Sequence, residues 1–275
     1  MKWNTSTKWI VAGLACLVLV IGGYYAFMSG DSPAPHGEHA PEEKATEDHD
    51  GHGDHDGHAD SEKSEVVPRV TTKGDQLVVS LEDDQGNPLD EGDLEITHER
   101  LMHLILVSRD LQEYHHLHPK PAKEGTFQVE SPLKSGSYQV FVDIQPKDRA
   151  YVVEPLSLQL GEKSTPEAEL KQDSDFTQTI RGTTVTMEPT TFRAGQPVTL
   201  DFSLEGGQPE PYLGALGHVV ILDEKAQDFI HVHPTSDKET RFETQFDRPG
   251  MYKIWAEFKI DGEVNIYSYE IEVEG

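Results

Sequence analysis

The chain has a single cysteine, Cys16, in 275 residues. That cysteine lies inside a long apolar run near the N-terminus, so no disulfide framework can form in the rest of the chain. No thiolate is available there for nucleophilic catalysis or metal binding. A blue-copper centre of two histidines and one cysteine is therefore excluded.

Basic side chains are also scarce, with 23 Lys and Arg against 50 Asp and Glu and a formal net charge of -27. Contacts to phosphates need Lys and Arg, which argues against nucleic acid as a partner. An acidic surface of this kind keeps a protein soluble and attracts cations. The short motifs of common enzymes are missing too: G-x-S-x-G, H-E-x-x-H and a phosphate-binding loop. We expect a protein that is not an enzyme.

One long apolar run is present, residues 9–28, which read WIVAGLACLVLVIGGYYAFM. At about 1.5 Å per residue, a helix of this length spans the roughly 30 Å core of a bilayer. Lys2 and Lys8 precede it, so the positive-inside rule puts residues 1–8 in the cytoplasm and the bulk of the chain outside. We predict a single-pass anchor in the cell membrane. The alternative is a cleaved signal peptide, which leaves the folded part exported as well.

Residues 29–65 form an acidic, histidine-rich segment that has too few apolar side chains to build a core. We expect a disordered linker, held extended by repulsion between its acids. Flexible His/Asp tracts wrap ions such as Cu, Zn and Ni without a preformed site, so this arm is predicted to collect metal weakly. The alternative is a solvating spacer. Its six histidines, of which the last four recur at every third position, are His36, His39, His49, His52, His55 and His58.

The rest of the chain contains an internal duplication. LMHLILVSRDLQEYHHLHP at 101–119 aligns without gaps with LGHVVILDEKAQDFIHVHP at 216–234. Short runs of Val, Ile, Leu and aromatic residues, bounded by Gly, Pro, Asp and Asn, read as strands in both copies. We predict an all-β fold of two tandem β-sandwich domains, immunoglobulin-like or cupredoxin-like, at 66–162 and 176–275, joined by a linker at 163–175. The predicted strands are Gln76–Leu81, Met102–Ser108, Ser137–Val142, Leu156–Leu160, Thr183–Met187, Val198–Leu204, His218–Leu222, Met251–Lys259 and Asn265–Val273.

Each copy carries the pattern H-x12-H-x-H, which gives the candidate metal ligands His103, His116, His118, His218, His231 and His233. On a strand, two histidines two places apart point to the same face. A hairpin turning near Asp110-Leu111 places His103 opposite His118, on that same face. In the second copy, placing His218 opposite His233 in the same way centres the hairpin on Lys225-Ala226.

Three converging imidazoles can hold copper or zinc and leave a coordination position open. Met102, beside His103, is a candidate soft ligand for Cu(I), but adjacent strand residues face opposite sides, so we expect Met102 in the core. His98 and His115 have no histidine counterparts in the second copy, so we expect them at the surface or in an accessory role. The alternative for all of these histidines is a hydrogen-bonded, structural role.

The segments HERLMHLILVSRDLQEYHHLHP and PYLGALGHVVILDEKAQDFIHVHP, each followed by a phenylalanine and a G-x-Y strand, resemble the bacterial YtkA-like and FixH-like extracytoplasmic β-domains. The similarity covers roughly residues 68–275. It implies an exported β-sandwich, and its FixH-like side implies an accessory role in the maturation of a metalloprotein or an oxidase. The doubled domain and the histidine-rich arm depart from a simple YtkA-like pattern.

The leading functional prediction is a membrane-anchored, extracytoplasmic metal-binding protein, with copper favoured and zinc as the alternative, that buffers or delivers the ion to a partner. A second prediction is a cell-surface interaction module of two sandwiches with structural histidines. A third, weaker one is a catalytic site with one metal ion, which needs an open coordination position in a pocket.

Overall fold

The computed structural model describes residues 63–188, 190–234 and 236–275, apart from the side chains of His231 and His233. The predicted anchor at 9–28 and almost all of the histidine-rich arm lie outside these residues. Within the described ranges, no helix is long and apolar enough to cross a membrane. Ser64 and Glu65, which the sequence places in the linker, are bound into the fold instead: the Glu65 N–H donates to the Ala150 carbonyl at 2.9 Å, and the Ser64 hydroxyl to that of Val152 at 3.3 Å.

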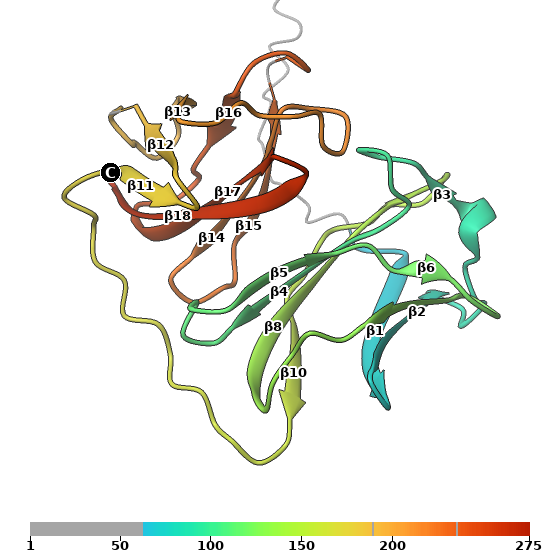
Figure 1. Cartoon of the computed structure of the whole chain (residues 1–275). Coiled ribbons are helices and arrows are strands. Elements are labelled where there is room, and N and C mark those ends of the chain that lie inside the picture. Colours follow the sequence, from blue (N-terminus) through green and yellow to red (C-terminus); the bar gives the residue numbers. More distant parts are fainter. Residues whose placement is uncertain (1–62, 189, 235) are drawn as a thin grey trace, which may run out of the picture. The chain divides into compact units, whose positions relative to one another are not determined.

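The described chain is all-β and contains two repeated domains (Figure 1). In the first domain, one sheet has the order β1 (Val66–Lys73), β2 (Gln76–Asp83), β7 (Thr126–Glu130) and β6 (Lys120–Pro121). The facing sheet has the order β10 (Leu156–Leu160), β8 (Gly136–Asp143), β4 (His103–Ser108) and β5 (Tyr114–Leu117). A short 3-10 turn, η1 (Glu91–Asp93), and the small pair β3 (Leu94–Glu95) and β9 (Gln145–Pro146) complete it.

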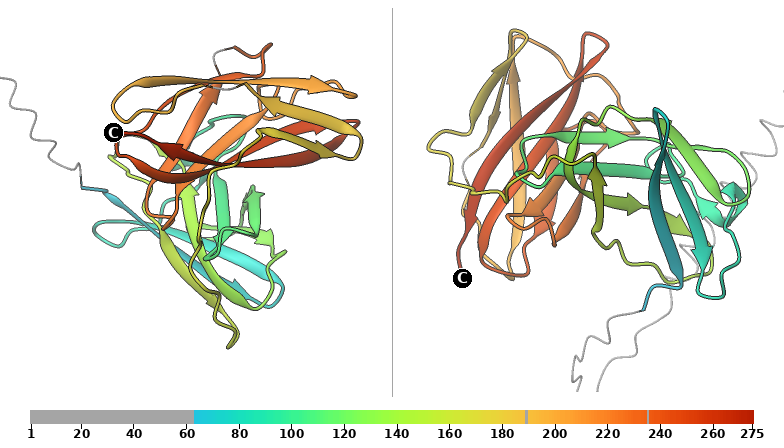
Figure 2. Two further views of the ribbon diagram at one scale, coloured as in Figure 1. Left: turned by 90° about the vertical axis from the view of Figure 1, so that its left-hand side faces the viewer. Right: turned by 90° about the horizontal axis from the view of Figure 1, so that it is seen from below.

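The second domain forms one continuous sheet of eight strands. Their order is β11 (Thr177–Ile180), β12 (Thr183–Met187), β13 (Pro197–Glu205), β16 (Arg241–Gln245), β15 (Phe229–Pro234), β14 (His218–Asp223), β17 (Gly250–Ile260) and β18 (Glu263–Val273). Figure 2 shows the long hairpin of β17 and β18 in red. The sheet is continuous because β15 pairs first with β14 and then, at His233 and Pro234, with β16. In the first domain, the matching strand β5 ends at Leu117, and the separate strand β6 makes the pairing with β7, so the two copies are less alike than the duplication predicts.

Each domain has its own apolar core, and every strand predicted from the sequence is present to within a few residues. Alternate side chains of β4, such as Leu104 and Leu106, fill the first core, and Val219 and Ile221 of β14 fill the second. Met102 is fully buried in the first core, which confirms its predicted place. The opposite faces of β4 and β14 are buried as well, and those faces carry the histidines.

A third apolar cluster joins the two domains through equivalent residues of the duplicated sequence. Ile105, Val107, Leu111, Tyr114 and Phe141 of the first domain contribute to it, together with Val220, Leu222, Ala226, Phe229 and Trp255 of the second. Tyr114 stacks on Trp255 with ring centroids 5.0 Å apart, and Phe141 stacks on Phe229 at the same separation. Because the partners in these two stacks exchange roles, the interface has the form of an approximate two-fold contact, as between the subunits of a symmetric dimer.

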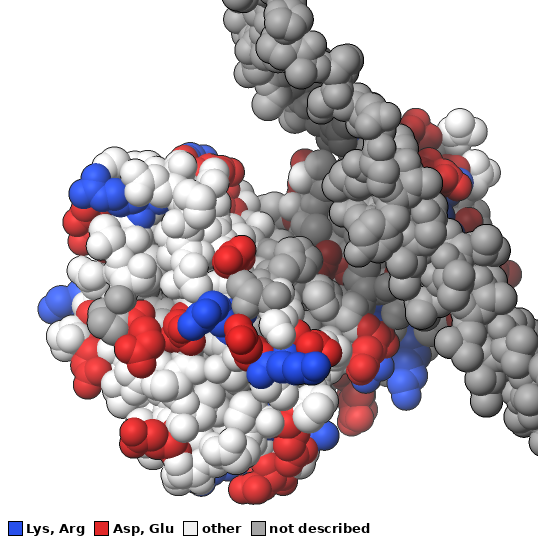
Figure 3. Space-filling view, turned by 90° about the horizontal axis from the view of Figure 1, so that it is seen from above, with Lys and Arg blue, Asp and Glu red and all other residues white. Residues whose placement is uncertain are grey.

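The predicted interdomain linker at 163–175 contains no strand, and part of it packs against this interface. Ala168 and Leu170 contact the third cluster, and the Leu170 N–H donates to the Glu224 carboxylate at 2.9 Å. On the surface shown in Figure 3, acidic and basic side chains of the described residues lie beside one another. The large negative charge of the chain therefore does not gather into one patch on that face.

Candidate metal centre

The first histidine motif lies on the hairpin of β4 and β5, in the register that the sequence predicts. Leu104 pairs with Leu117 and Ile105 with His116, so the next pair in the same register is His103 and His118. The turn is centred on Asp110 and Leu111, and Leu111 has a positive φ of 55°. Directly opposed residues share a face, and His116 lies two places from His118. The predicted register of this hairpin is confirmed.

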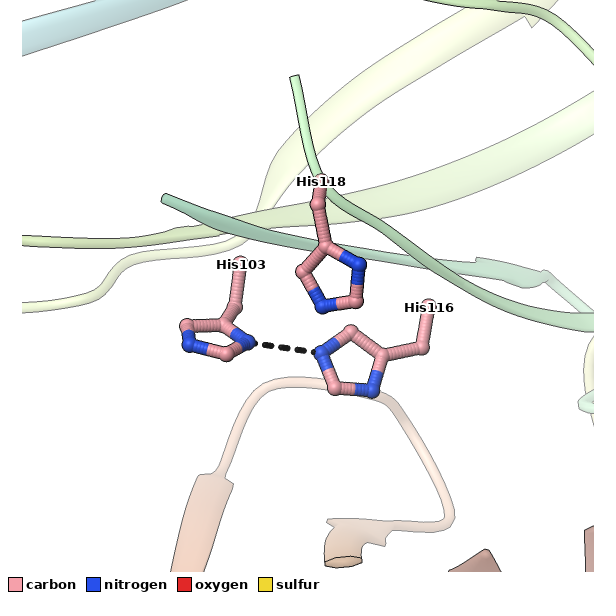
Figure 4. Close-up of side chains that lie close together, drawn as sticks. All are labelled: His103, His116 and His118. Atoms are coloured by element: carbon pink, nitrogen blue, oxygen red, sulfur yellow. Dashed lines mark hydrogen bonds between the residues drawn. The ribbon is translucent and has the colours of Figure 1, made fainter. Parts of the chain in front are cut away.

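The three histidines converge. His103, His116 and His118 each offer a ring nitrogen, and these atoms all lie within 4.8 Å of one another. The ring centroids are 5.1 Å apart for His103 and His116, 5.1 Å for His103 and His118, and 4.7 Å for His116 and His118. Figure 4 shows all three rings facing a common space, with a nitrogen of His118 pointing toward the gap between the other two.

Hydrogen bonds orient two of the rings. The Nε2–H of His103 donates to the Thr97 carbonyl at 3.0 Å, which makes Nδ1 the acceptor nitrogen of that ring. His103 Nδ1 lies 2.9 Å from His116 Nε2. His116 Nδ1–H donates to both carboxylate oxygens of Glu257 at 3.1 Å. The nitrogens that face each other, Nδ1 of His103 and Nε2 of His116, are thus the ones that a metal ion could bridge.

His118 is the unsatisfied member of the group. Its Nε2 is buried and has no hydrogen-bond partner. Burial, followed by the electrostatic effects of His116, His103 and Arg100, lowers the pKa of His118 to about 3. The ring is therefore neutral at ordinary pH, which is the form that ligates metals. A buried polar atom without a partner is costly, and a bound ion would satisfy it.

Glu257 of the second domain belongs to the candidate site, and the sequence interpretation missed it. Its side chain is 1% exposed, and it accepts a hydrogen bond from the Tyr114 hydroxyl at 2.7 Å as well as the two from His116. Burial, together with this carboxylate, raises the pKa of Tyr114 well above its usual value. A carboxylate behind a histidine holds the ring in its ligating tautomer at many metal sites.

A signal for Glu257 was present in the duplication. Glu257 pairs with His218 across β14 and β17, and Asp143 pairs with His103 across β4 and β8. Both acids lie two places after the matched aromatic residues Phe141 and Trp255. The repeat alignment therefore showed an acid at the same position in both copies, and the strand register places it opposite the first histidine of each motif.

The remaining histidines occupy different places. His98 is half-buried, and its ring lies 5.9 Å from that of His103 and 5.2 Å from that of His218. It therefore borders the cluster. His115 lies on the other face of β5, where burial lowers its pKa against the opposing effect of Glu113. Its Nε2 is buried without a hydrogen-bond partner.

The second motif is only partly described. Val219 pairs with Val232 and Val220 with His231, so the register of β14 and β15 matches that of the first hairpin and places His218 opposite His233. The imidazole of His218 is 2% exposed, whereas the side chains of His231 and His233 lie outside the described residues. A second three-histidine set stays a prediction.

The donor set is three imidazoles, one backed by a carboxylate, with no sulfur ligand. Imidazole nitrogens suit Cu(II) and Zn(II), and three of them leave room for a fourth ligand. Beside the histidines lies a pocket of about 650 Å³, lined by His116, His118, Arg100 and Leu101 among others. This pocket gives the cluster a route to solvent.

A family model described as "Domain of unknown function (DUF8832)" matches the chain twice, at residues 61–157 and 178–275. This match does not test the resemblance to YtkA-like and FixH-like domains, which stays a prediction. No curated protein matches the chain.

Three similar solved structures have low scores. The BSP domain of a biofilm-associated protein is 12% identical with a TM-score of 0.22, and the match covers 76% of this chain and 30% of that one. A tetra-tandem repeat in the extending region of a large adhesion protein is 13% identical with a TM-score of 0.24, covering 77% and 50%. The chicken CNTN1 FN1-FN3 domains are 11% identical with a TM-score of 0.22, covering 75% and 66%. Scores this low carry no information on function.

Proposed function

The chain belongs to the DUF8832 family of domains of unknown function, and we propose that it is a membrane-anchored, extracytoplasmic protein that binds a transition-metal ion at His103, His116 and His118. The observation that supports this most directly is the buried Nε2 of His118, which has no partner and belongs to a ring that faces two other imidazoles. The Glu257–His116 contact adds the outer carboxylate that metal-bound histidines commonly have.

Copper is the ion we favour, with zinc as the alternative. Both accept imidazole nitrogen, and Cu(II) binds a given nitrogen site more tightly than the other divalent ions of the first transition row. The role we propose is a buffer or chaperone: the histidines of the arm at 29–65 collect ions, and the folded site holds them for a metalloprotein or oxidase partner. We also assign both domains to the immunoglobulin-like or cupredoxin-like class, on the strength of their antiparallel strand pairing.

The competing function is a surface interaction module whose histidines are structural. One observation favours it: His103 and His218 each donate a ring N–H to a carbonyl of a nearby turn, Thr97 and Leu213, as structural histidines do. The unsatisfied nitrogen of His118 is the observation against it, because a purely structural network would give that buried atom a partner.

Calorimetric titration with Cu²⁺ and Zn²⁺ tests the proposal. The full-length chain is used with Asn in place of the six arm histidines, so that the arm does not compete. In this background we compare His118→Gln with His115→Gln, since both remove a buried ring nitrogen without a hydrogen-bond partner from the same segment, but His115 lies on the other face of β5. We expect tight binding in the background and in His115→Gln, and binding weaker by about 100-fold or more in His118→Gln.

Melting curves of the metal-free proteins provide the control for folding. Both variants should unfold cooperatively near the melting temperature of the background chain. If the background chain binds neither ion, or if His118→Gln binds as tightly as His115→Gln, the histidines are structural and the interaction-module function takes precedence.

A further inference from the structure

The described metal site is contacted by a fourth histidine that comes from the other domain. His218 is 2% exposed, and its ring centroid lies 6.2 Å from that of His103 and 5.9 Å from that of His116. The rings of His103 and His218 are nearly parallel, with planes 24° apart. The first histidines of the two motifs therefore face each other across the approximate two-fold interface.

These separations can be compared with those of a tetrahedral centre. With metal–nitrogen bonds of about 2.0–2.1 Å, the ring centroids of four imidazoles on one ion lie roughly 5.2 Å apart. The three first-domain rings are already at 4.7–5.1 Å. His218 is not among the residues whose ring nitrogens all lie within 4.8 Å of one another. Its ring lies about 1 Å further from those of His103 and His116 than in a tetrahedral centre, so it has to move toward the ion to join them.

His218 is held by a turn carbonyl, as His103 is, but the two carbonyls lie at neighbouring places of the repeat, since Thr97 matches Tyr212 and Leu213 matches His98. The Nε2–H of His218 donates to the Leu213 carbonyl at 3.3 Å, as that of His103 donates to the Thr97 carbonyl at 3.0 Å. Both carbonyls belong to matching tight turns, closed by the bridges Thr97–Arg100 and Tyr212–Ala215. In each ring, Nε2 is therefore the nitrogen bound to a turn carbonyl.

We propose that His218 is the fourth ligand of the ion held by His103, His116 and His118, so that a single metal ion clamps the two domains together. This inference rests on the proposed function. In this arrangement His218 belongs to a site shared by both domains and not to a separate second site. The second domain also supplies Glu257, the positioning residue of His116. Structural metal sites are closed by four protein ligands, whereas a catalytic site keeps one coordination position open.

The alternative to a closed site is an open coordination position that faces the pocket beside His116 and His118. Water or a small anion would then complete the coordination sphere. The two arrangements differ in one measurable property, since only the open one accepts an added anion at the metal without losing a histidine.

Co²⁺ serves as the probe, because its visible spectrum reports coordination number and ligand exchange. The full-length chain with Asn in place of the six arm histidines is loaded with Co²⁺ and titrated with azide. We expect the spectrum of the unmutated site to be insensitive to azide. In His218→Gln, azide should enter the vacated position and shift the spectrum, and the affinity for Co²⁺ should fall about tenfold or more. His115→Gln is the control and should behave like the unmutated site.

If azide changes the Co²⁺ spectrum of the unmutated site, the inference is overturned, and this result does not depend on the folding of any variant. Unchanged Co²⁺ affinity in His218→Gln overturns it as well. If the unmutated site binds no Co²⁺, Cu²⁺ or Zn²⁺, the proposed function itself fails, and that outcome is distinct from tight binding with an open position.

Discussion

Glu257 of the second domain binds side chains of the first domain at the candidate site. It is buried, and its neighbours Tyr114 and His116 both donate to it from the first domain. A buried carboxylate is costly unless donors surround it, and here two side chains of the first domain supply them. The candidate metal site and the interdomain contact therefore share the same hydrogen bonds.

Replacing this carboxylate should weaken the site without removing a ligand. In Glu257→Gln, the side chain keeps its size but loses the charge that orients His116, and we expect metal affinity to fall about 10- to 100-fold. Calorimetric titration with Cu²⁺ measures the change. Glu263→Gln is the control, because Glu263 lies at the surface in an ion pair with Arg181. Equal affinities in the two variants would show that Glu257 has no role in metal binding.

At the scale of elements, both copies begin their histidine hairpin from the same kind of tight turn. Residues 98 and 99 have φ values of 48° and 63°, and residues 213 and 214 have 54° and 82°. Two successive positive φ angles define a type I′ turn, whose second position favours glycine. The second copy has Gly214 there, whereas the first has Glu99. These turns present the carbonyls that orient His103 and His218.

The turn conformation can be tested at Gly214, where an added Cβ meets no atom within 4 Å. Because φ is +82°, Gly214→Ala should still destabilise the protein, by about 1–2 kcal/mol, through backbone strain alone. Gly92→Ala is the matched control, since its Cβ also meets nothing and its φ lies outside the positive range. Chemical denaturation measures both. A Gly214→Ala variant as stable as Gly92→Ala would contradict the assigned turn.

At the scale of the whole molecule, the two domains share one interface, and the site lies at that interface. The stacks of Tyr114 on Trp255 and Phe141 on Phe229 keep the domains together in the metal-free protein. A ligand that binds only the docked form stabilises the docked form. Metal binding and domain docking are therefore expected to be coupled.

The coupling should be visible in thermal unfolding. With Zn²⁺ at about 100 times its dissociation constant, binding adds roughly 2.7 kcal/mol, which corresponds to a rise in Tm of about 5–10 °C for a protein of this size. Differential scanning calorimetry on the chain without arm histidines measures it, and excess chelator should reverse it. His118→Gln should show no rise. If that variant shows the same rise, the stabilising ion binds elsewhere.

Some of this could be predicted from the sequence because the information is local. The alternation and turn residues predict the strands, and the spacing of His103, His116 and His118 predicts a shared face once the hairpin is centred on Asp110 and Leu111. The duplication predicts two like domains. The sequence also indicated that β4 and β14 are buried on both faces. After their first histidine, the runs at 103–107 and 218–222 are continuously apolar, whereas a half-exposed strand alternates apolar and polar residues.

Only the tertiary structure decided which residues cover the histidine-bearing faces of β4 and β14, and which residues of the second domain adjoin the candidate site. Glu257 lies 141 residues from His116 along the chain, and no local pattern relates them. The nearness of His218 to His103 arises from the docking of two complete domains, which depends on the summed packing of side chains such as Trp255 and Phe141. Local spacing therefore determined which residues could ligate, and the long-range packing determined which of them meet.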